Sequence, residues 1–167
     1  CRVRTGEDAF DRGWWTWRQI SMRLFRIGEL EYELSEHAGE KAIAIHIPSD
    51  ALFTPEKIND SLQQAQKFIT EHFSAYSQSI YFCSSWLLSP HLAALLDEAS
   101  NIRKFQERFI LEKDLPQDTG YMEWLFGKAP GTPVEALPEN TSLQKKVKGD
   151  LRAGKNLGAG VGRLKGM

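Results

Sequence analysis

Apolar and polar residues alternate over two short stretches near the start of the chain, a pattern typical of β-strands with one buried face. The apolar positions are Ile20, Met22 and Leu24 in the first stretch and Leu30, Tyr32 and Leu34 in the second. Gly28-Glu29 lies between the two stretches and suits a tight turn. The pattern therefore predicts an antiparallel β-hairpin.

The residues before this hairpin are rich in tryptophan and have two interpretations. Trp14, Trp17 and Leu24 fall on one side of a helix, but the same aromatic side chains also suit a strand that packs on a sheet. We interpret the first half of residues 11–18 as helical. The cluster of Trp14, Trp15 and Trp17 is typical of a core or a domain interface.

The region 41–88 predicts a strand, a helix and a second strand. Residues 41–48 alternate, with Ile43, Ile45 and Ile47 on one face. Thr54 as N-cap and Pro55 at the first helical position indicate where the helix begins. Apolar residues then recur at helical spacing, namely Ile58, Leu62, Ala65, Ile69 and Phe73. Residues 79–88 are an almost continuous apolar run, typical of a strand buried on both faces, so we expect a parallel βαβ unit.

Four weaker patterns follow this unit. Residues 90–98 predict a short helix after Ser89-Pro90, and residues 107–113 alternate like a strand. Residues 141–154 predict a helix that Thr141 caps and Gly154 ends. The glycine-rich tail 156–167 follows a helix and opens none, so it is no nucleotide-binding loop, and we expect a loop or an edge strand.

The composition excludes several classes of function. The 167 residues are 41% hydrophobic, which suits one globular domain. The formal net charge of -1 gives no basic surface for nucleic acid or for an anionic membrane. No apolar run reaches the roughly 20 residues that a membrane-spanning helix needs. We therefore expect a cytoplasmic protein that binds neither nucleic acid nor membranes.

The cysteines and histidines form no pattern of their own. Cys1 and Cys83 lie far apart, unlike the dense cysteine framework of small secreted domains, so we expect reduced thiols. The four histidines and two cysteines fall at none of the usual metal-ligand spacings, so we expect no metal.

Several phrases of the sequence, together with the order of the predicted elements, resemble a known family. The phrases are RLFRIGELEYEL, IHIPSDALFTPEKINDSLQQAQKF, YFCSSWLLSPHL, SNIRKFQERFIL and TSLQKKVKGDLRAG. They resemble the GNAT-like C-terminal domain of bacterial acyltransferase-domain-containing proteins, within the GNAT N-acyltransferase superfamily. The resemblance covers most of residues 14–160.

This resemblance implies an α/β (α+β) fold with a mixed central sheet, in which an antiparallel hairpin and a βαβ unit are flanked by helices. It also implies a division into three parts. Residues 1–16 would end an upstream helical region, residues 17–113 would form the GNAT-like core, and residues 114–167 would form a C-terminal extension. The upstream N-terminal domain would then be a partner of this chain.

The same resemblance implies acetyl-CoA or acyl-CoA as co-substrate and an amine of a small molecule or peptide as acceptor. In GNAT enzymes the strand at 41–48 would offer backbone groups to the pantetheine arm and diverge from the strand at 79–88. The loop at 49–55 would hold the pyrophosphate with its N–H groups. The implied CoA-binding residues are Ile45, His46, Ile47, Ser49, Thr54, Cys83 and Ser85.

The loop at 49–55 departs from the pattern of GNAT enzymes. It contains no glycine, Asp50 would place a negative charge near two phosphates, and the Pro55 nitrogen donates no hydrogen bond. Thr54 and the helix dipole still favour an anion. Two hypotheses therefore stay open: an acyl-CoA-dependent N-acyltransferase, or a GNAT-like non-catalytic binding or scaffolding module that has lost CoA binding.

Three residues are candidates for catalysis, namely His46, Ser84 and Tyr81. His46 stands near the carboxyl end of a central strand, where open α/β sheets bind ligands, and is our preferred base for an amine, although a histidine there also suits a hydrogen-bonded core or rim position. Family resemblance implies a polar or proton-transfer role at Ser84, where a histidine often stands, and a tyrosine acid that Tyr81 would replace. We expect Cys83 to be a structural thiol, and a thiol enzyme using Cys83 and His46 is a more distant alternative.

Overall fold

The first two strands form the hairpin that the alternating pattern predicts. In the computed structural model of the protein, which describes residues 23–166, β1 (Leu24–Ile27) pairs antiparallel with β2 (Leu30–His37). Gly28 in the turn has a φ of 62°, a left-handed conformation that glycine adopts without strain. The predicted helix around Trp14 lies outside the described residues, as do the strand positions Ile20 and Met22.

The βαβ unit is also confirmed. Strand β3 (Glu40–His46) pairs antiparallel with β2, and β4 (Ile80–Ser85) pairs parallel with β3 after the crossover helix α2 (Pro55–His72). Thr54 occupies the N-cap position, but its side chain makes no capping hydrogen bond. The prediction that its oxygen caps α2 is therefore wrong.

Short helices and two further strands complete the fold. They are η1 (Ser74–Tyr76), η2 (Trp86–Leu88), α3 (Pro90–Leu95), α4 (Asn101–Gln106), β5 (Phe109–Leu115), α5 (Tyr121–Phe126), η3 (Val134–Ala136), α6 (Ser142–Arg152) and β6 (Ala159–Leu164). The predicted cap of α6 is confirmed, because the Thr141 hydroxyl accepts a hydrogen bond from the Gln144 N–H. Within residues 23–166, no helix is long and apolar enough to cross a membrane.

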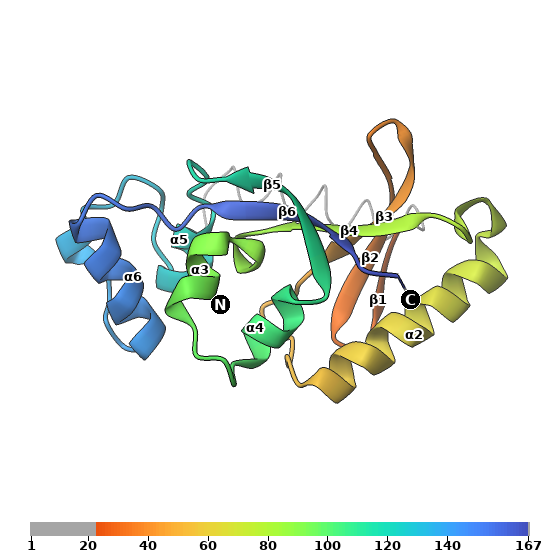
Figure 1. The fold of residues 1–167 in the computed structure, drawn as a ribbon, viewed down its shortest axis with the longest axis horizontal. Coiled ribbons are helices and arrows are strands. Elements are labelled where there is room, and N and C mark those ends of the chain that lie inside the picture. The colour runs from red at the N-terminus through yellow and green to blue at the C-terminus, as the bar shows by residue number, and fades with distance from the viewer. Residues whose placement is uncertain (1–22, 167) are drawn as a thin grey trace, which may run out of the picture.

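Strand β6 lies inside the sheet, which corrects the expectation that the glycine-rich tail is a loop or an edge strand. The strand order is β1-β2-β3-β4-β6-β5, and β6 pairs antiparallel with both of its neighbours (Figure 1). Its glycines make this position possible: a Cβ at Gly160 would collide with the Leu88 carbonyl oxygen, and a Cβ at Gly162 would lie 3.1 Å from Phe109 Cβ. The alternating glycines thus serve close packing.

Strand β4 is shorter than the apolar run at 79–88 predicts. The strand ends at Ser85, and the next three residues form the 3-10 turn η2. Ser85 contributes to this change of direction, because its hydroxyl accepts a hydrogen bond from the Leu87 N–H at 3.1 Å and caps the turn.

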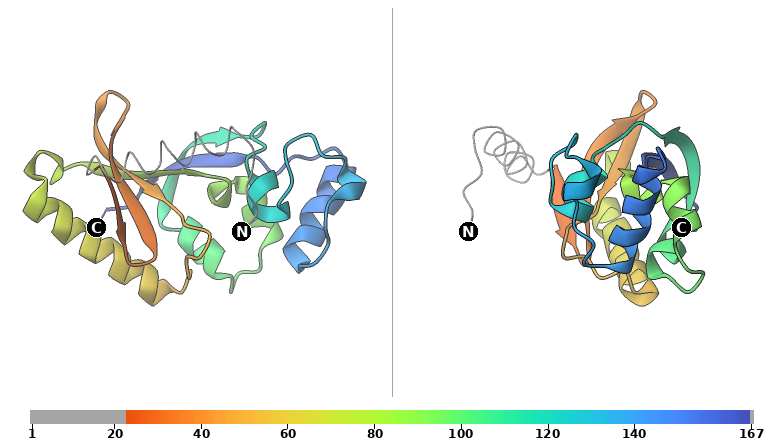
Figure 2. Two further views of the ribbon diagram at one scale, coloured as in Figure 1. Left: turned by 180° about the vertical axis from the view of Figure 1, so that it is seen from behind. Right: turned by 90° about the vertical axis from the view of Figure 1, so that its left-hand side faces the viewer.

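Helices α2 and α4 lie along the same side of the sheet, and α3, α5 and α6 gather toward one end of it (Figures 1 and 2). The expected boundary between residues 113 and 114 falls inside β5. Strand β6, from the expected extension, pairs with β4 of the expected core. One sheet therefore contains strands from both parts.

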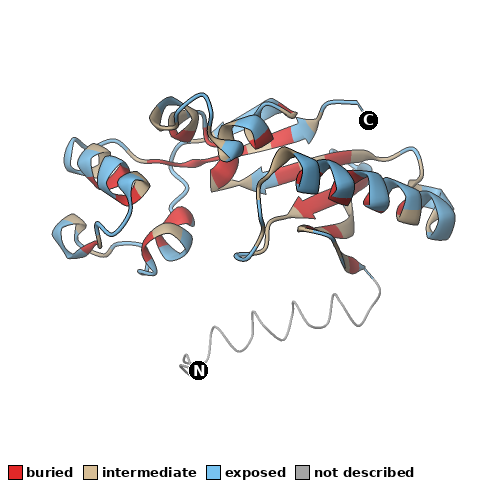
Figure 3. Ribbon diagram, turned by 90° about the horizontal axis from the view of Figure 1, so that it is seen from below, coloured by how far each residue is buried: buried red, intermediate tan, exposed pale blue. Residues whose placement is uncertain are grey.

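The buried residues form two clusters, which meet near the carboxyl end of β3. Figure 3 marks the buried positions on the strands and helices. The first packs α2 against the sheet and contains Leu30, Tyr32, Ile43, Ile45, Ile58, Leu62, Ala65, Ile69, Tyr81, Cys83, Leu88, Phe105 and Phe109. The second joins η2, α3, α5 and α6 through Leu87, Leu92, Tyr121, Met122, Phe126, Leu137, Val147 and Leu157. Ile47 and Phe53 are partly buried and pack against both clusters.

A buried polar contact holds α2 against the first hairpin. Ser61 donates its hydroxyl proton to the Ile27 carbonyl oxygen and accepts a hydrogen bond from the Tyr32 hydroxyl at 2.8 Å. Burial raises the pKa of Tyr32, so this hydroxyl stays a donor. Gly28 lies so close that a Cβ there would be 3.0 Å from Ser61 Cβ. The hairpin turn is therefore fixed beside α2.

We expect Gly160→Ala to lower the free energy of unfolding by about 1–3 kcal/mol, the usual cost of overpacking. The added methyl group would collide with the Leu88 backbone. Urea unfolding followed by tryptophan fluorescence measures the change. Gly149→Ala is the control: Gly149 is exposed on α6 with nothing within 4 Å of an added Cβ, so alanine should raise stability by up to about 1 kcal/mol. Unchanged stability of Gly160→Ala would contradict the position of β6.

We expect Cys83 to react with a thiol reagent only as fast as the folded protein opens. Cys83 is 1% exposed, and burial raises the pKa of its thiol to about 12, so almost no thiolate forms at neutral pH. Labelling followed by mass spectrometry with and without urea measures this, with free cysteine as the reference thiol. Fast labelling of Cys83 in the native protein would instead favour the thiol-enzyme hypothesis.

Candidate functional site

The carboxyl ends of β3 and β4 separate, and this opening is the candidate site. The two strands are paired at Ala42–Ile80, Ile43–Tyr81 and Ala44–Phe82, and their pairing ends there. Beyond that point β3 stays paired with β2 as far as His46, while β4 pairs with β6 as far as Ser85. The facing edges of the two strand ends therefore have no ladder between them, as an extended ligand with amide groups requires.

The residues predicted from the sequence divide between the two faces of the sheet at this opening. Ile45, Tyr81 and Cys83 point toward α2, and their exposed fractions are 2%, 9% and 1%. Burial raises the pKa of the Tyr81 hydroxyl to about 12. Only the backbone of these three positions faces the opening. His46 and Ser84 belong to the opposite face, because side chains alternate along a strand.

His46 forms a pair with a carboxylate that the sequence analysis missed. Its Nε2 lies 2.9 Å from Oε2 of Glu33, and the two side chains are 30% and 13% exposed. Glu31 stands directly opposite His46 in the β2–β3 register, and burial raises the pKa of the Glu31 carboxyl. The signal was present in the sequence, since Glu31 and Glu33 alternate with the buried residues of β2.

Two serines lie at the end of β4. Ser84 is exposed and lies on the same face of the sheet as His46, on the other side of the opening. The Ser85 hydroxyl caps η2 and is thus engaged in the protein's own backbone. Of the two, Ser84 is the hydroxyl on the same face as the histidine.

The loop before α2 is occupied by a carboxylate from the hairpin turn. Glu29 accepts a hydrogen bond from the Leu52 N–H at 2.8 Å and another from Lys57 Nζ at 3.1 Å. These bonds, the backbone bond first, lower the pKa of the Glu29 carboxyl, so it is charged at neutral pH. The loop amide of Leu52 therefore binds an anion that belongs to the chain itself.

Asp50 in the same loop pairs with Arg26 of β1, whose Nη1 lies 2.9 Å from Oδ1 of Asp50. This hydrogen bond lowers the pKa of the Asp50 carboxyl. Ser49 is exposed and Thr54 is half-buried, so both hydroxyls stay near the surface at the start of α2. The sequence analysis identified Asp50 but not Arg26 or Glu29, which come from the hairpin.

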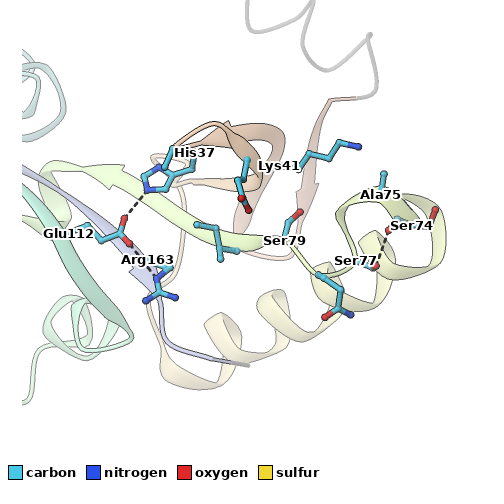
Figure 4. A pocket seen from close by; sticks show the side chains of 12 residues that line it. His37, Lys41, Ser74, Ala75, Ser77, Ser79, Glu112 and Arg163 are labelled. Atoms are coloured by element: carbon cyan, nitrogen blue, oxygen red, sulfur yellow. Dashed lines mark hydrogen bonds and ion pairs between the residues drawn. The ribbon is translucent and has the colours of Figure 1, made fainter.

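A separate hollow of about 920 Å³ opens at the other end of β3 and β4 (Figure 4). His37, Lys41, Ser79 and Arg163 are among the residues that line it. The carboxylate of Glu112 binds both His37, at 2.8 Å, and Arg163, at 3.3 Å. Three of its charged or titratable groups, His37, Glu112 and Arg163, are thus paired with one another, and the hollow lies away from the strand ends where an α/β sheet binds ligands.

No group of three or more His, Cys, Asp or Glu side chains within the described part of the chain could hold a metal ion.

Solved structures of similar fold carry acyl-CoA ligands. An acyltransferase in complex with decanoyl-CoA aligns with a TM-score of 0.81 and 30% identity, over 90% of this chain and 48% of that chain. An acyltransferase in complex with decanoyl-CoA and teicoplanin aligns with a TM-score of 0.81 and 28% identity, over 91% and 49%. An acyltransferase in complex with CoA and 10C-teicoplanin aligns with a TM-score of 0.82 and 28% identity, over 91% and 49%. The chain thus spans about half the length of these structures.

No curated protein matches the sequence. The family model described as GNAT-like C-terminal domain matches residues 24–164. This match confirms the resemblance inferred from the sequence, and the mixed sheet with its separated central strands agrees with it. The chain belongs to the family of GNAT-like C-terminal domains.

Proposed function

We propose that this chain is the acyl-CoA-binding part of an N-acyltransferase, which transfers an acyl group to an amine. The separation of β3 and β4 is the observation that carries the proposal. Structures at 28–30% identity that hold decanoyl-CoA or CoA support it. The acceptor would be an amine of a small molecule or a peptide.

In this proposal the strand ends hold the pantetheine arm of CoA. The backbone of Ile45, His46 and Ile47 on one side, and of Cys83 and Ser85 on the other, supplies the hydrogen-bonding groups, while Ser49, Thr54 and the first turn of α2 face the phosphates. The amine attacks the thioester carbonyl of acyl-CoA, a C–N bond forms as the C–S bond breaks, and CoA leaves as a thiolate that takes up a proton. In this arrangement the thioester lies beside His46, whose side chain can accept a proton.

His46 is the proposed base, because it lies at the end of β3 and shares a face with Ser84. Its imidazole would accept the proton that the amine loses, and the Glu33 carboxylate would hold the ring in place. Ser84 would contribute a hydroxyl to the same face. Tyr81 would have no proton-transfer role, because its ring packs in the core beneath α2.

We further propose that the acceptor is bound jointly with an upstream N-terminal domain. The chain covers 48–49% of the acyltransferase structures it resembles, so half of each of those proteins has no counterpart here. A domain of that size packed on the face that carries His46 would bring the amine to the opening.

A second function, a binding module without CoA, is favoured by the acidic loop. Glu29 takes the Leu52 amide, and Asp50 adds a second negative charge. Both carboxylates would repel a pyrophosphate placed before α2, although Lys57 and Arg26, which pair with Glu29 and Asp50, offset part of this charge. If this repulsion prevails, CoA should bind no tighter than roughly the millimolar range.

We expect Glu29→Gln to strengthen CoA binding about threefold to tenfold at low salt, with a smaller gain at high salt because ions screen the repulsion. Asp50→Asn should act in the same direction. Calorimetric titration with CoA measures both. Glu71→Gln is the control, since Glu71 is an exposed carboxylate at the far end of α2.

Three outcomes of this titration separate the two functions. Micromolar binding that Glu29→Gln improves would favour the transferase with phosphates at the loop. Micromolar binding that neither variant changes would place the phosphates elsewhere on the protein. No detectable binding in wild type and both variants would favour the non-catalytic module.

We expect His46→Gln to reduce kcat for acyl transfer by about 10²–10⁴-fold, the range usual for loss of a general base. The KM for acyl-CoA should stay within about twofold, because backbone groups bind the pantetheine. His91→Gln is the matched control: His91 is 32% exposed and pairs with Asp150 at 2.9 Å, but on α3. Equal losses of kcat in the two variants would remove His46 as the base.

A further inference from the structure

Gln106, the last residue of α4, has one half of its amide bound and the other half unused. Its Nε2 donates hydrogen bonds to the Leu87 carbonyl at 2.7 Å and to the Ser89 carbonyl at 3.3 Å. Its Oε1 is buried and has no hydrogen-bond partner; among the described residues no other buried side-chain nitrogen or oxygen is in that state. A buried acceptor without a donor is unfavourable, so this atom calls for an explanation.

The orientation of this amide is determined by its surroundings. Exchanging the oxygen and nitrogen would place Oε1 against two carbonyl oxygens, which accept hydrogen bonds and donate none. The unpaired atom is therefore the oxygen, and its donor must be an N–H or O–H that the described residues do not supply, from a ligand or from water.

Helix α4 contacts the segments that follow both strands of the opening. Phe105 packs edge-on against Phe53, with ring centroids 5.2 Å apart, and Phe53 belongs to the loop that follows β3. The next residue, Gln106, is bonded to η2 and Ser89, which follow β4. Arg108 then donates hydrogen bonds to Asn59 and to the Pro55 carbonyl at the start of α2. Gln106 thus lies on a segment that packs against the residues that follow both diverging strands.

We propose that Gln106 Oε1 accepts a hydrogen bond from an amide N–H of the pantetheine arm of CoA. This rests on the proposed acyl-CoA-dependent function. Phe105, the preceding residue, and Leu87, whose carbonyl Gln106 binds, are buried apolar residues, so the ligand must be slender and carry an isolated donor. In an acyl-CoA the thioester and acyl chain have no N–H, the adenine amino group and ribose hydroxyl belong to the bulky phosphorylated nucleotide, and the slender pantetheine arm carries two amide N–H groups besides one hydroxyl. Gln106 would therefore be a binding residue that recognises the pantetheine arm through a hydrogen bond.

A thermodynamic cycle between the protein and the ligand tests the pairing. The probes are CoA and two CoA analogues in which one or the other pantetheine amide is replaced by an ester. Gln106→Met removes the acceptor, and Gln64→Met on the exposed side of α2 is the control. Calorimetry gives Kd for each combination. We expect one ester analogue to bind wild type and Gln64→Met about tenfold more weakly than CoA, and Gln106→Met to show less than a twofold difference between the same ligands.

A second variant guards against loss of fold, because Gln106→Met also loses the two bonds to carbonyl oxygens. Gln106→Lys offers those carbonyls a donor but provides no acceptor, and it should abolish the ester penalty in the same way. An equal ester penalty in wild type and both variants, or none at either amide, would overturn the role of Gln106 while leaving CoA binding intact. Absence of CoA binding by wild type would overturn the proposed function and this inference together.

Discussion

The change of partner along β4 is the constraint on which the candidate site depends. Phe82 pairs with Ala44 of β3 on one side and with Arg163 of β6 on the other, and past it only the β6 pairing continues. Gly160 allows η2 to fold back over β6, which a larger residue would prevent. The opening between β3 and β4 is therefore maintained by contacts on the far side of β4, away from any ligand.

A second constraint comes from the first hairpin. Ser61 and Tyr32 hold the Gly28 turn against α2, and this places the Glu29 carboxylate on the Leu52 amide. A loop without glycine is thus stabilised from inside the molecule by a charge that resembles the ligand such loops bind elsewhere. The loop lacks glycine, and the Glu29 carboxylate accepts the hydrogen bond of the Leu52 N–H that a ligand could otherwise accept.

The strands and helices with clear periodicity were predictable from local sequence. The alternation in 30–34 and 41–48, and the spacing from Ile58 to Ile69, each report which face of an element is buried. Strand β6 was not predictable in this way, because its glycines are required by close contacts with Leu88 and Phe109, which are distant in sequence. The Glu33–His46 pair could have been found by aligning the faces of β2 and β3, whereas the Glu29–Leu52 contact needed the docking of the turn on α2.

The place of β6 in the sheet has a consequence for how the protein is made. Of the strands within residues 23–166, β6 is synthesised last, yet it lies between β4 and β5. Until it emerges from the ribosome, β4 lacks a partner on one edge and β5 lacks one on both edges, and unpaired edges invite association with other chains. Completion of the sheet must therefore wait for the end of this segment, and during this interval the centre of the sheet is open to wrong pairings.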